Sequence, residues 1–165
     1  MLSTASWSET RTMTRRRPSV FRAAALGLIA AACSISSGPA FLNTRTDACA
    51  TCRMIVSDVR FASQIVARYE EPRFFDDLGC LRKYLETARL PQGAVVYVAD
   101  HRTSEWVRAD AAVFSRSSAV VAPMGSRFIA HVSAASRQSD PDAATLVAVD
   151  RRDVLGDLVP QEGAR

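Results

Sequence analysis

Short segments in the first half of the chain alternate hydrophobic and polar residues or form brief apolar runs, and both patterns indicate strands. Alternation places successive side chains on opposite faces of a sheet, so that one face is buried and the other is exposed. The segments with these patterns are residues 54–57, 62–69, 73–75 and 95–99. Pro91 and Gly93 break the chain before the last of them.

A helix is predicted between the third and fourth of these strands, from about Asp77 to Ala88. Asp76 or Asp77 can cap it, because a carboxylate there accepts hydrogen bonds from the first free backbone amides. Its apolar residues recur at helical spacing, and they are Leu78, Leu81 and Leu85. Cys80 lies beside them and is expected mainly as a small buried residue.

The second half of the chain repeats this order. It predicts strands at 104–109, 118–122, 127–132 and 146–149, a short helix at 110–114, and a turn or helix after Asp140-Pro141. Two strands, a helix and a strand thus occur twice, which predicts an α+β fold in one small domain. In this pairing Pro123-Met124-Gly125 corresponds to Cys52-Arg53-Met54, so that sulfur atoms from the two halves could meet.

The N-terminal residues have the pattern of an export signal. A basic segment that includes Arg15, Arg16 and Arg17 is followed by an apolar run over residues 23–32. This run is far shorter than the roughly 20 apolar residues of a membrane-spanning helix. We therefore expect a signal peptide over residues 1–32.

The residues around Cys33 bear on how that signal is removed. Ala31 and Ala32 precede Cys33 as in a bacterial lipobox, in which the cysteine becomes the lipid-modified first residue of an exported protein. Such a lipid would anchor the protein to a membrane. Simple cleavage near Ala40 is the alternative. Residues 33–46 are expected to form a linker in either case.

Charge argues against a nucleic-acid partner. The whole chain has a formal net charge of +4, but residues 1–32 contain five Arg and one acidic residue. Without this segment the chain is formally neutral, so it has no basic surface to attract nucleic acid. We expect one domain over residues 47–155, followed by a tail over residues 156–165.

Three sulfur donors occur within six residues, in Cys49-Ala50-Thr51-Cys52-Arg53-Met54. Polarisable thiolate and thioether donors favour Cu(I), whereas Zn(II) usually takes four Cys or His ligands. We therefore predict a Cu(I) site at Cys49, Cys52 and Met54. Cys80, His101 and His131 are candidates for additional ligands.

The spacing of Cys49 and Cys52 also allows a disulfide. If Cys33 carries lipid, three cysteines remain, so one must stay free, pair between chains or bind metal. The alternative to copper binding is a thiol-disulfide oxidoreductase, or a structural lipoprotein with a Cys49–Cys52 disulfide. A redox CxxC motif normally opens a helix, whereas a strand is predicted after Cys52.

No catalytic arrangement is evident in the sequence. It contains no Ser/His/Asp order, no phosphate-binding glycine loop and no HExxH motif. We therefore expect a carrier and not an enzyme. A carrier benefits from an accessible site of two or three ligands, because a partner's ligand can then bind the ion before the old ligand leaves.

The order and spacing of several short motifs resemble the NosL family of nitrous-oxide-reductase accessory proteins over about residues 47–155. These motifs are Cys49-Ala-Thr-Cys52-Arg-Met54, Ala62-Ser-Gln64-Ile65, Phe75-Asp76-Asp77-Leu-Gly79-Cys80-Leu81 with Tyr84, Tyr97-Val98-Ala-Asp100, Glu105-Trp106 and Pro123-Met124-Gly125. Arg53 stands where the family usually has Gly.

The resemblance implies a fold and a function. The fold would consist of two related ββαβ-type units, with a topology similar to that of the organomercurial lyases. The protein would be a periplasmic or outer-surface copper-binding lipoprotein that delivers Cu(I) to nitrous oxide reductase. The positions that match the family's ligands are Cys52, Met54 and Met124.

Overall fold

The computed structural model describes residues 38–156. The predicted signal peptide over residues 1–32, the lipidation site Cys33 and residues 157–165 of the predicted tail lie outside the described residues. No helix within residues 38–156 is long and apolar enough to cross a membrane.

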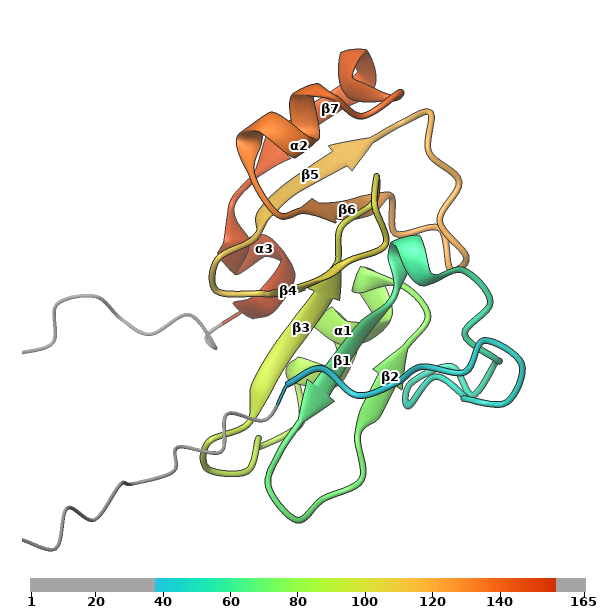
Figure 1. The fold of residues 1–165 in the computed structure, drawn as a ribbon, viewed down its shortest axis with the longest axis vertical. Coiled ribbons are helices and arrows are strands. Elements are labelled where there is room, and N and C mark those ends of the chain that lie inside the picture. Colours follow the sequence, from blue (N-terminus) through green and yellow to red (C-terminus); the bar gives the residue numbers. More distant parts are fainter. Residues whose placement is uncertain (1–37, 157–165) are drawn as a thin grey trace, which may run out of the picture. The chain divides into compact units, whose positions relative to one another are not determined.

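Strands and short helices are joined by turns and loops in the described part of the chain (Figure 1). The strands are β1 (Ser63–Val66), β2 (Arg73–Phe75), β3 (Val95–Ala99), β4 (Trp106–Arg108), β5 (Val113–Ser117), β6 (Phe128–His131) and β7 (Leu146–Val149). The α-helices are α1 (Leu78–Leu85), α2 (Ala134–Gln138) and α3 (Arg151–Leu155). The 3-10 helices are η1 (Val59–Phe61) and η2 (Ala143–Thr145).

The strands form two antiparallel sheets that share one pattern. The first sheet has the order β2-β1-β3-β4, and the second has the order β6-β5-β7. The chain runs β1-β2-α1-β3 in the first motif and β5-β6-α2-β7 in the second, and in each motif the first strand lies between the other two. The predicted α+β fold with two ββαβ motifs is therefore confirmed, with β4 and α3 as additions.

The two motifs meet where β3 ends beside β6. Asp100 and Ala130 form a parallel backbone bridge, and the N–H of His101 donates to the carbonyl of Ala130 at 2.8 Å. This junction brings the turn after β3 close to the end of β6. His101 and His131 both lie at this junction.

The predicted strand at 54–57 is wrong. In this segment only Ile55 pairs with another strand-like residue, in an isolated bridge with Ala48. The backbone of the segment is used instead in a tight loop, in which the N–H of Cys49 donates to the carbonyl of Met54 at 2.8 Å. The loop is set by backbone hydrogen bonds that the hydrophobic pattern does not report.

The predicted helix at 110–114 and the predicted strand at 118–122 are also wrong. The strand of this region is β5, over Val113–Ser117, which overlaps the end of the predicted helix and stops before the predicted strand. Phe114, Ser115 and Ser117 are all buried in it. Because two of these buried residues are serines, β5 lacks the alternation by which a strand is recognised. Helix α2 was not predicted, since its sequence AASRQ has no apolar stripe.

The main core lies between α1 and the first sheet, and Figure 1 shows α1 behind β1 and β3. Phe75, Leu78, Leu81 and Val98 are almost completely buried in it. Burial of one such side chain contributes about 1.5–3 kcal/mol. The predicted leucine pattern of α1 is thus the pattern that fixes this helix against the sheet.

The predicted linker over residues 33–46 packs against the domain from Ala40 onward. The N–H of Ala40 donates to Oε1 of Gln64 at 2.7 Å, and Nε2 of Gln64 donates back to the Ala40 carbonyl at 3.2 Å. Gln64 is fully buried, so this pair satisfies an amide inside the core. Leu42 packs against the same core.

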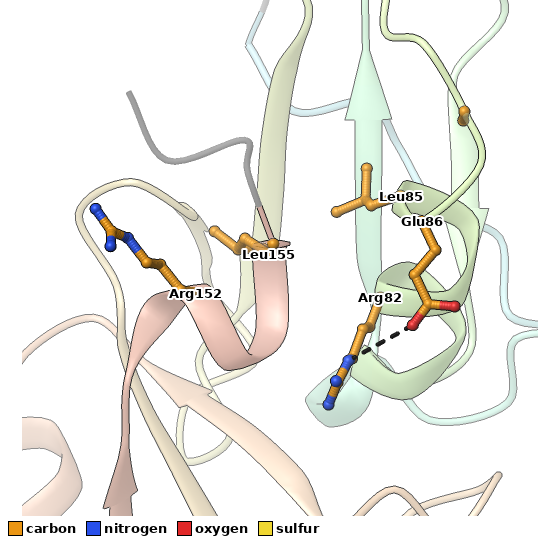
Figure 2. A pocket seen from close by; sticks show the side chains of 7 residues that line it. Arg82, Leu85, Glu86, Arg152 and Leu155 are labelled. Atoms are coloured by element: carbon orange, nitrogen blue, oxygen red, sulfur yellow. Dashed lines mark ion pairs between the residues drawn. The ribbon is translucent and has the colours of Figure 1, made fainter. Parts of the chain in front are cut away.

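A pocket of about 370 Å³ lies beside α1 and α3 (Figure 2). It is lined by Arg82, Leu85, Glu86, Ala88, Arg152, Leu155 and Gly156. Arg82 and Glu86 form an ion pair across one turn of α1, at 3.8 Å. The lining offers no sulfur or imidazole donor, so the candidate site lies elsewhere.

Candidate metal centre

The loop that contains Cys49 and Cys52 is tied to the first sheet. The N–H of Ala50 donates to the carbonyl of Phe74 in β2 at 2.8 Å, and Cys49 forms a parallel bridge with Phe74. The N–H of Arg53 donates to the carbonyl of Cys49 at 3.0 Å, which closes a tight turn over the two cysteines. The cysteine pair therefore has a fixed backbone position.

Helix α1 brings a third cysteine to this turn. The hydroxyl of Thr51 donates to the carbonyl of Cys80 at 2.9 Å and so joins the loop to the helix. The Sγ atoms of Cys49, Cys52 and Cys80 lie within 4.8 Å of one another and could hold one metal ion. All three are free thiols. Cys80 is buried as expected, but its sulfur also joins the cysteine pair.

The three thiols differ in how easily they ionise. Burial of Cys49 opposes loss of its proton, but hydrogen bonds from the backbone of Cys52, Asp76 and Thr51 outweigh burial and lower the pKa of Cys49. Burial raises the pKa of both Cys52 and Cys80, and the nearby Cys49 raises it further. The first thiolate therefore forms at Cys49, and a cation is needed to hold further thiolates beside it.

Met124 approaches the cysteines from the second motif. It lies in a turn between β5 and β6 in which the N–H of Gly125 donates to the carbonyl of Ala122 at 2.9 Å. Pro123 suits the second position of such a turn because its φ is fixed. Gly125 has a φ of 70°, in the left-handed region that favours glycine.

Asp77 fixes this turn to α1. It is the N-cap of the helix, and its Oδ1 accepts from the N–H groups of Gly79 and Cys80. Its Oδ2 accepts from the N–H groups of Met124 and Ser126, both at 3.2 Å. One buried carboxylate thus holds the helix that carries Cys80 and the turn that carries Met124.

The sulfur residues surround a pocket of about 360 Å³. It is lined by Thr51, Cys52, Asp77, Gly79, Cys80, Lys83, Met124 and Ser126. We call it the sulfur pocket. Cys49 does not line it and is fully buried, with its sulfur within 4.8 Å of those of Cys52 and Cys80. Met54 does not line this pocket but a neighbouring hollow, together with Asp76 and Pro123.

The predicted equivalence of Cys52-Arg53-Met54 and Pro123-Met124-Gly125 is wrong in topology. The first segment precedes β1, whereas the second connects β5 to β6. The two segments nevertheless contribute to one place, because Asp77 links the second to α1 and Thr51 links the first to α1. Helix α1 is therefore the element around which the site is organised.

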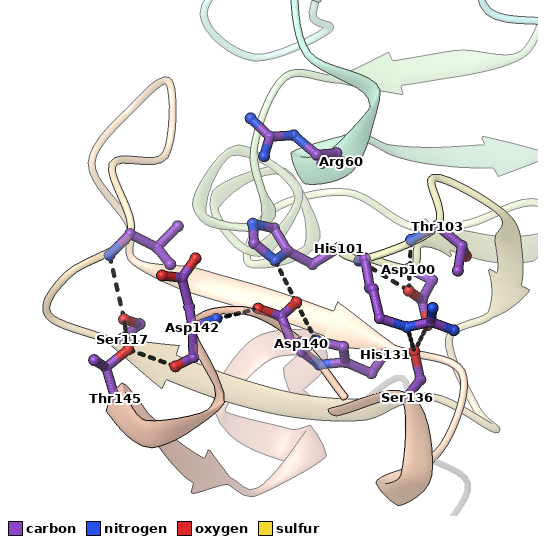
Figure 3. A network of polar contacts seen from close by, with 12 residues as sticks. Arg60, Asp100, His101, Thr103, Ser117, His131, Ser136, Asp140, Asp142 and Thr145 are labelled. Atoms are coloured by element: carbon purple, nitrogen blue, oxygen red, sulfur yellow. Dashed lines mark hydrogen bonds and ion pairs between the residues drawn. The ribbon is translucent and has the colours of Figure 1, made fainter. Parts of the chain in front are cut away.

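The two candidate histidines lie in a different cluster. His101 and His131 both bond to Asp140, in a buried group that is separate from the three cysteines (Figure 3). Asp140 was not predicted as a functional residue. Asp77 was predicted first as a helix cap and second as a contact to a partner. The aspartate pair before α1 is the one sequence signal that pointed to Asp77, and nothing in the spacing of Asp140 pointed to the histidines.

A family model for NosL matches residues 41–141. The chain belongs to the NosL family. No curated protein and no solved structure matches the chain significantly. Family membership suggests a copper-binding accessory protein, and the NosL family is an accessory family and not a catalytic one. The group of Cys49, Cys52 and Cys80 that could hold a metal agrees with this.

Arg53 is the position at which this NosL chain departs from the usual Gly. Its φ is 68°, which lies in the left-handed region. A side chain at this φ costs about 1–2 kcal/mol relative to the right-handed region. Arg53 therefore adopts a backbone conformation that glycine would adopt more easily.

Proposed function

We propose that this NosL protein is an exported carrier that binds Cu(I) in the sulfur pocket and delivers it to a periplasmic copper enzyme, nitrous oxide reductase. The observation that carries the proposal is that Cys52, Cys80 and Met124 line one pocket, while the Sγ atom of Cys49 lies within 4.8 Å of the other two cysteine sulfurs. No cysteine lines the pocket beside α1 and α3, the hollow at Met54, the pocket at Leu90 and Val96, or the pocket at Phe114 and Val149.

The donor chemistry favours Cu(I). Thiolate and thioether sulfur are soft donors, and thioethers in particular are seldom ligands of Zn(II). Cu(I) accepts two or three ligands, so it does not require every sulfur atom of the site. A cation also offsets the burial, and the smaller repulsion from Cys49, that raise the pKa of Cys52 and Cys80.

The layout of the site supports transfer and not storage. Cys49 is fully buried, while Cys52 is half-buried and Met124 is 45% exposed. A ligand from a partner can therefore reach the ion from the side of Cys52 and Met124. The old ligands can then leave one at a time, which a closed four-ligand site does not allow.

The thiol-disulfide oxidoreductase is the alternative, and the geometry argues against it. In a redox CxxC motif the first cysteine is the accessible, acidic thiol that attacks. Here the first cysteine, Cys49, has the lowered pKa but is fully buried, while the more accessible Cys52 has the raised pKa. No helix opens at Cys52, which lies in a turn.

The proposal is tested by anaerobic Cu(I) titration of the reduced protein against a chromophoric competitor, with native mass spectrometry for stoichiometry. We expect one Cu(I) per chain. Cys52→Ser should weaken binding by more than about 100-fold, since even residues that only support ligands are worth 10- to 100-fold. Thr51→Ser is the control, because Thr51 lines the same pocket and serine keeps its hydroxyl. Equal affinity in Cys52→Ser and the parent would end the proposal.

Delivery is tested separately. Copper-loaded protein is mixed with apo nitrous oxide reductase, and copper in the enzyme is measured after the two are separated. We expect transfer from the parent and little from Cys52→Ser loaded to the same copper content. Strong binding without transfer would support a copper store in place of a carrier.

We also propose that the protein is a lipoprotein, anchored to a membrane by Cys33. The basic segment, the apolar run and the small residues before Cys33 support this. Cells labelled with a fatty acid should contain a labelled, membrane-bound protein, and Cys33→Ser should release it unlabelled. Recovery of cytoplasmic protein with its N-terminal segment intact would contradict export.

A further inference from the structure

A second cluster of metal-ligating side chains lies where the two motifs meet. His101 follows β3, His131 is the last residue of β6, and Asp140 follows α2. Figure 3 shows both imidazole rings directed toward the carboxylate of Asp140. The side chains are 5%, 0% and 0% exposed, so water contributes little to the interactions among them.

The three donors are arranged around one point. Nδ1 of His101 lies 2.8 Å from Oδ2 of Asp140, and Nε2 of His131 lies 3.1 Å from the same oxygen. All three ligand atoms lie within 4.8 Å of one another. Donors bound tetrahedrally to one ion at about 2.0–2.2 Å are separated by about 3.3–3.6 Å, which is slightly more than the two distances here. Small movements of these side chains would therefore admit an ion.

The surrounding structure holds the donors in place. Oδ1 of Asp140 accepts from the N–H of Asp142 at 2.8 Å, which leaves Oδ2 for the imidazoles. The ring of Phe61 packs edge-on against His101, with 5.2 Å between the ring centres. Such support from outside the ligand shell is typical of metal sites, where it fixes the orientation of each ligand.

The hydrogen bonds of the cluster leave one imidazole nitrogen without a partner. If His131 donates its Nε2–H to Asp140, its Nδ1 is a buried acceptor that has no partner among the described residues. With an ion on Nε2, a neutral His131 carries its proton on Nδ1, which is then a buried donor in the same surroundings. This nitrogen therefore does not distinguish the two states, and an ion is indicated by the convergence and burial of the three donors.

We propose that His101, His131 and Asp140 form a second metal site, for a borderline divalent cation such as Zn(II). Two imidazoles and a carboxylate suit such an ion, whereas the absence of sulfur from this set makes it a poor site for Cu(I). His101 comes from the first motif and the other two ligands come from the second. The ion would therefore cross-link the motifs and stabilise their junction without taking part in copper transfer.

The test must separate this site from the thiols, which also bind Zn(II). The full chain with Cys33, Cys49, Cys52 and Cys80 all changed to Ser is titrated with Zn(II) and then passed through a desalting column. We expect one Zn(II) to be retained per chain, with a higher melting temperature than in the metal-free protein. Asp140→Asn in this background should bind Zn(II) at least tenfold more weakly while its circular dichroism spectrum is unchanged.

Two comparisons keep the result interpretable. Asp142→Asn is the matched control, because Asp142 contacts the cluster through its backbone N–H and its side chain can be changed without loss of a ligand. If the serine variant does not fold, Co(II) titration of the parent chain still decides the matter. Thiolate ligation adds intense near-ultraviolet charge-transfer absorption, whereas a His/His/Asp site shows only d–d bands. The proposal would be overturned if the folded serine variant retained no Zn(II), or if Asp140→Asn bound Zn(II) equally well. In the parent chain, it would be overturned if all Co(II) absorption rose together with the thiolate bands.

Discussion

The carboxylate of Asp77 accepts a hydrogen bond from the backbone N–H of Met124 at 3.2 Å, although the two residues belong to different motifs. The same side chain caps α1, the helix that carries Cys80. The position of Met124 relative to the cysteines therefore depends on one buried residue. Changes at Asp77 should affect both the stability of the fold and the binding of copper.

The first prediction concerns Asp77→Asn. Asparagine keeps the shape but offers one acceptor oxygen, and its NH₂ group would face N–H groups that now donate to Oδ1 or Oδ2. Hydrogen bonds to charged acceptors are worth about 1.5–3 kcal/mol each, so we expect the free energy of unfolding to fall by about 2–4 kcal/mol in urea titrations.

A matched control for this change is Asp153→Asn, since Asp153 is exposed on α3 and is expected to change stability by less than about 1 kcal/mol. Cu(I) affinity should fall in folded Asp77→Asn and stay constant in the control. Full copper affinity together with lowered stability would show that Met124 does not depend on Asp77 for its ligand role.

The second prediction concerns the contact between α1 and the Met124 turn. A Cβ atom at Gly79 would lie 2.6 Å from Cβ of Ser126 and 2.9 Å from Oδ1 of Asp77. Alanine normally stabilises a helix by about 0.5–1 kcal/mol relative to glycine, but overpacking costs about 1–3 kcal/mol. Gly79→Ala should therefore lower the melting temperature.

Ser126→Gly in the same chain removes the closer of the two contacts. We expect a double-mutant cycle to show that Gly79→Ala is less destabilising in the Ser126→Gly background. Gly38→Ala serves as control, because a Cβ atom at Gly38 would meet nothing within 4 Å. If the stability changes of Gly79→Ala and Ser126→Gly were strictly additive, the two positions would not be in tight contact. The Met124 turn could then shift away from α1 without cost.

Local patterns predicted a helix with one apolar face and strands that are continuous apolar runs. The three leucines and the aspartate before them indicated α1, and the range 146–149 coincides with β7. Strand β5 was missed because it buries serines on the face that the pattern expects to be apolar. Which polar residues are buried is decided by the neighbouring strands, and the sequence of one strand does not contain that information.

The same limit applies to the candidate site. Cys49 and Cys52 could be recognised as a pair because they are three residues apart, and a family resemblance added Met124. Cys80 reaches them only through the packing of α1 on the Cys49 loop, with the Thr51 hydroxyl bonded to the Cys80 carbonyl. Its place on an apolar helix face correctly predicted that Cys80 is buried. Burial alone does not say which segment of the chain packs against that face.

The third prediction concerns Arg53, which is exposed and has a φ of 68°. Arg53→Gly removes a left-handed side chain that costs about 1–2 kcal/mol, while the greater freedom of glycine in the unfolded chain takes back about 0.5–1 kcal/mol. We expect a net gain of about 0.5 kcal/mol in the free energy of unfolding. A loss of stability in calorimetry would show that the arginine side chain makes a favourable contact that offsets the strain.

The last prediction separates Met124 from Met54, which are both exposed, at 45% and 59%, and were both predicted as ligands. Met124 lines the sulfur pocket, whereas Met54 lines the neighbouring hollow. Leucine keeps the volume of methionine and should lower stability by less than about 1.5 kcal/mol at either position. We therefore expect Met124→Leu to weaken Cu(I) binding by about tenfold, which is about 1.4 kcal/mol, and Met54→Leu to have little effect. Competitive titration of both variants at equal protein concentration measures this difference. Equal weakening would mean that Met54 turns into the pocket when copper binds, and no weakening in either variant would leave the three cysteines as the ligand set.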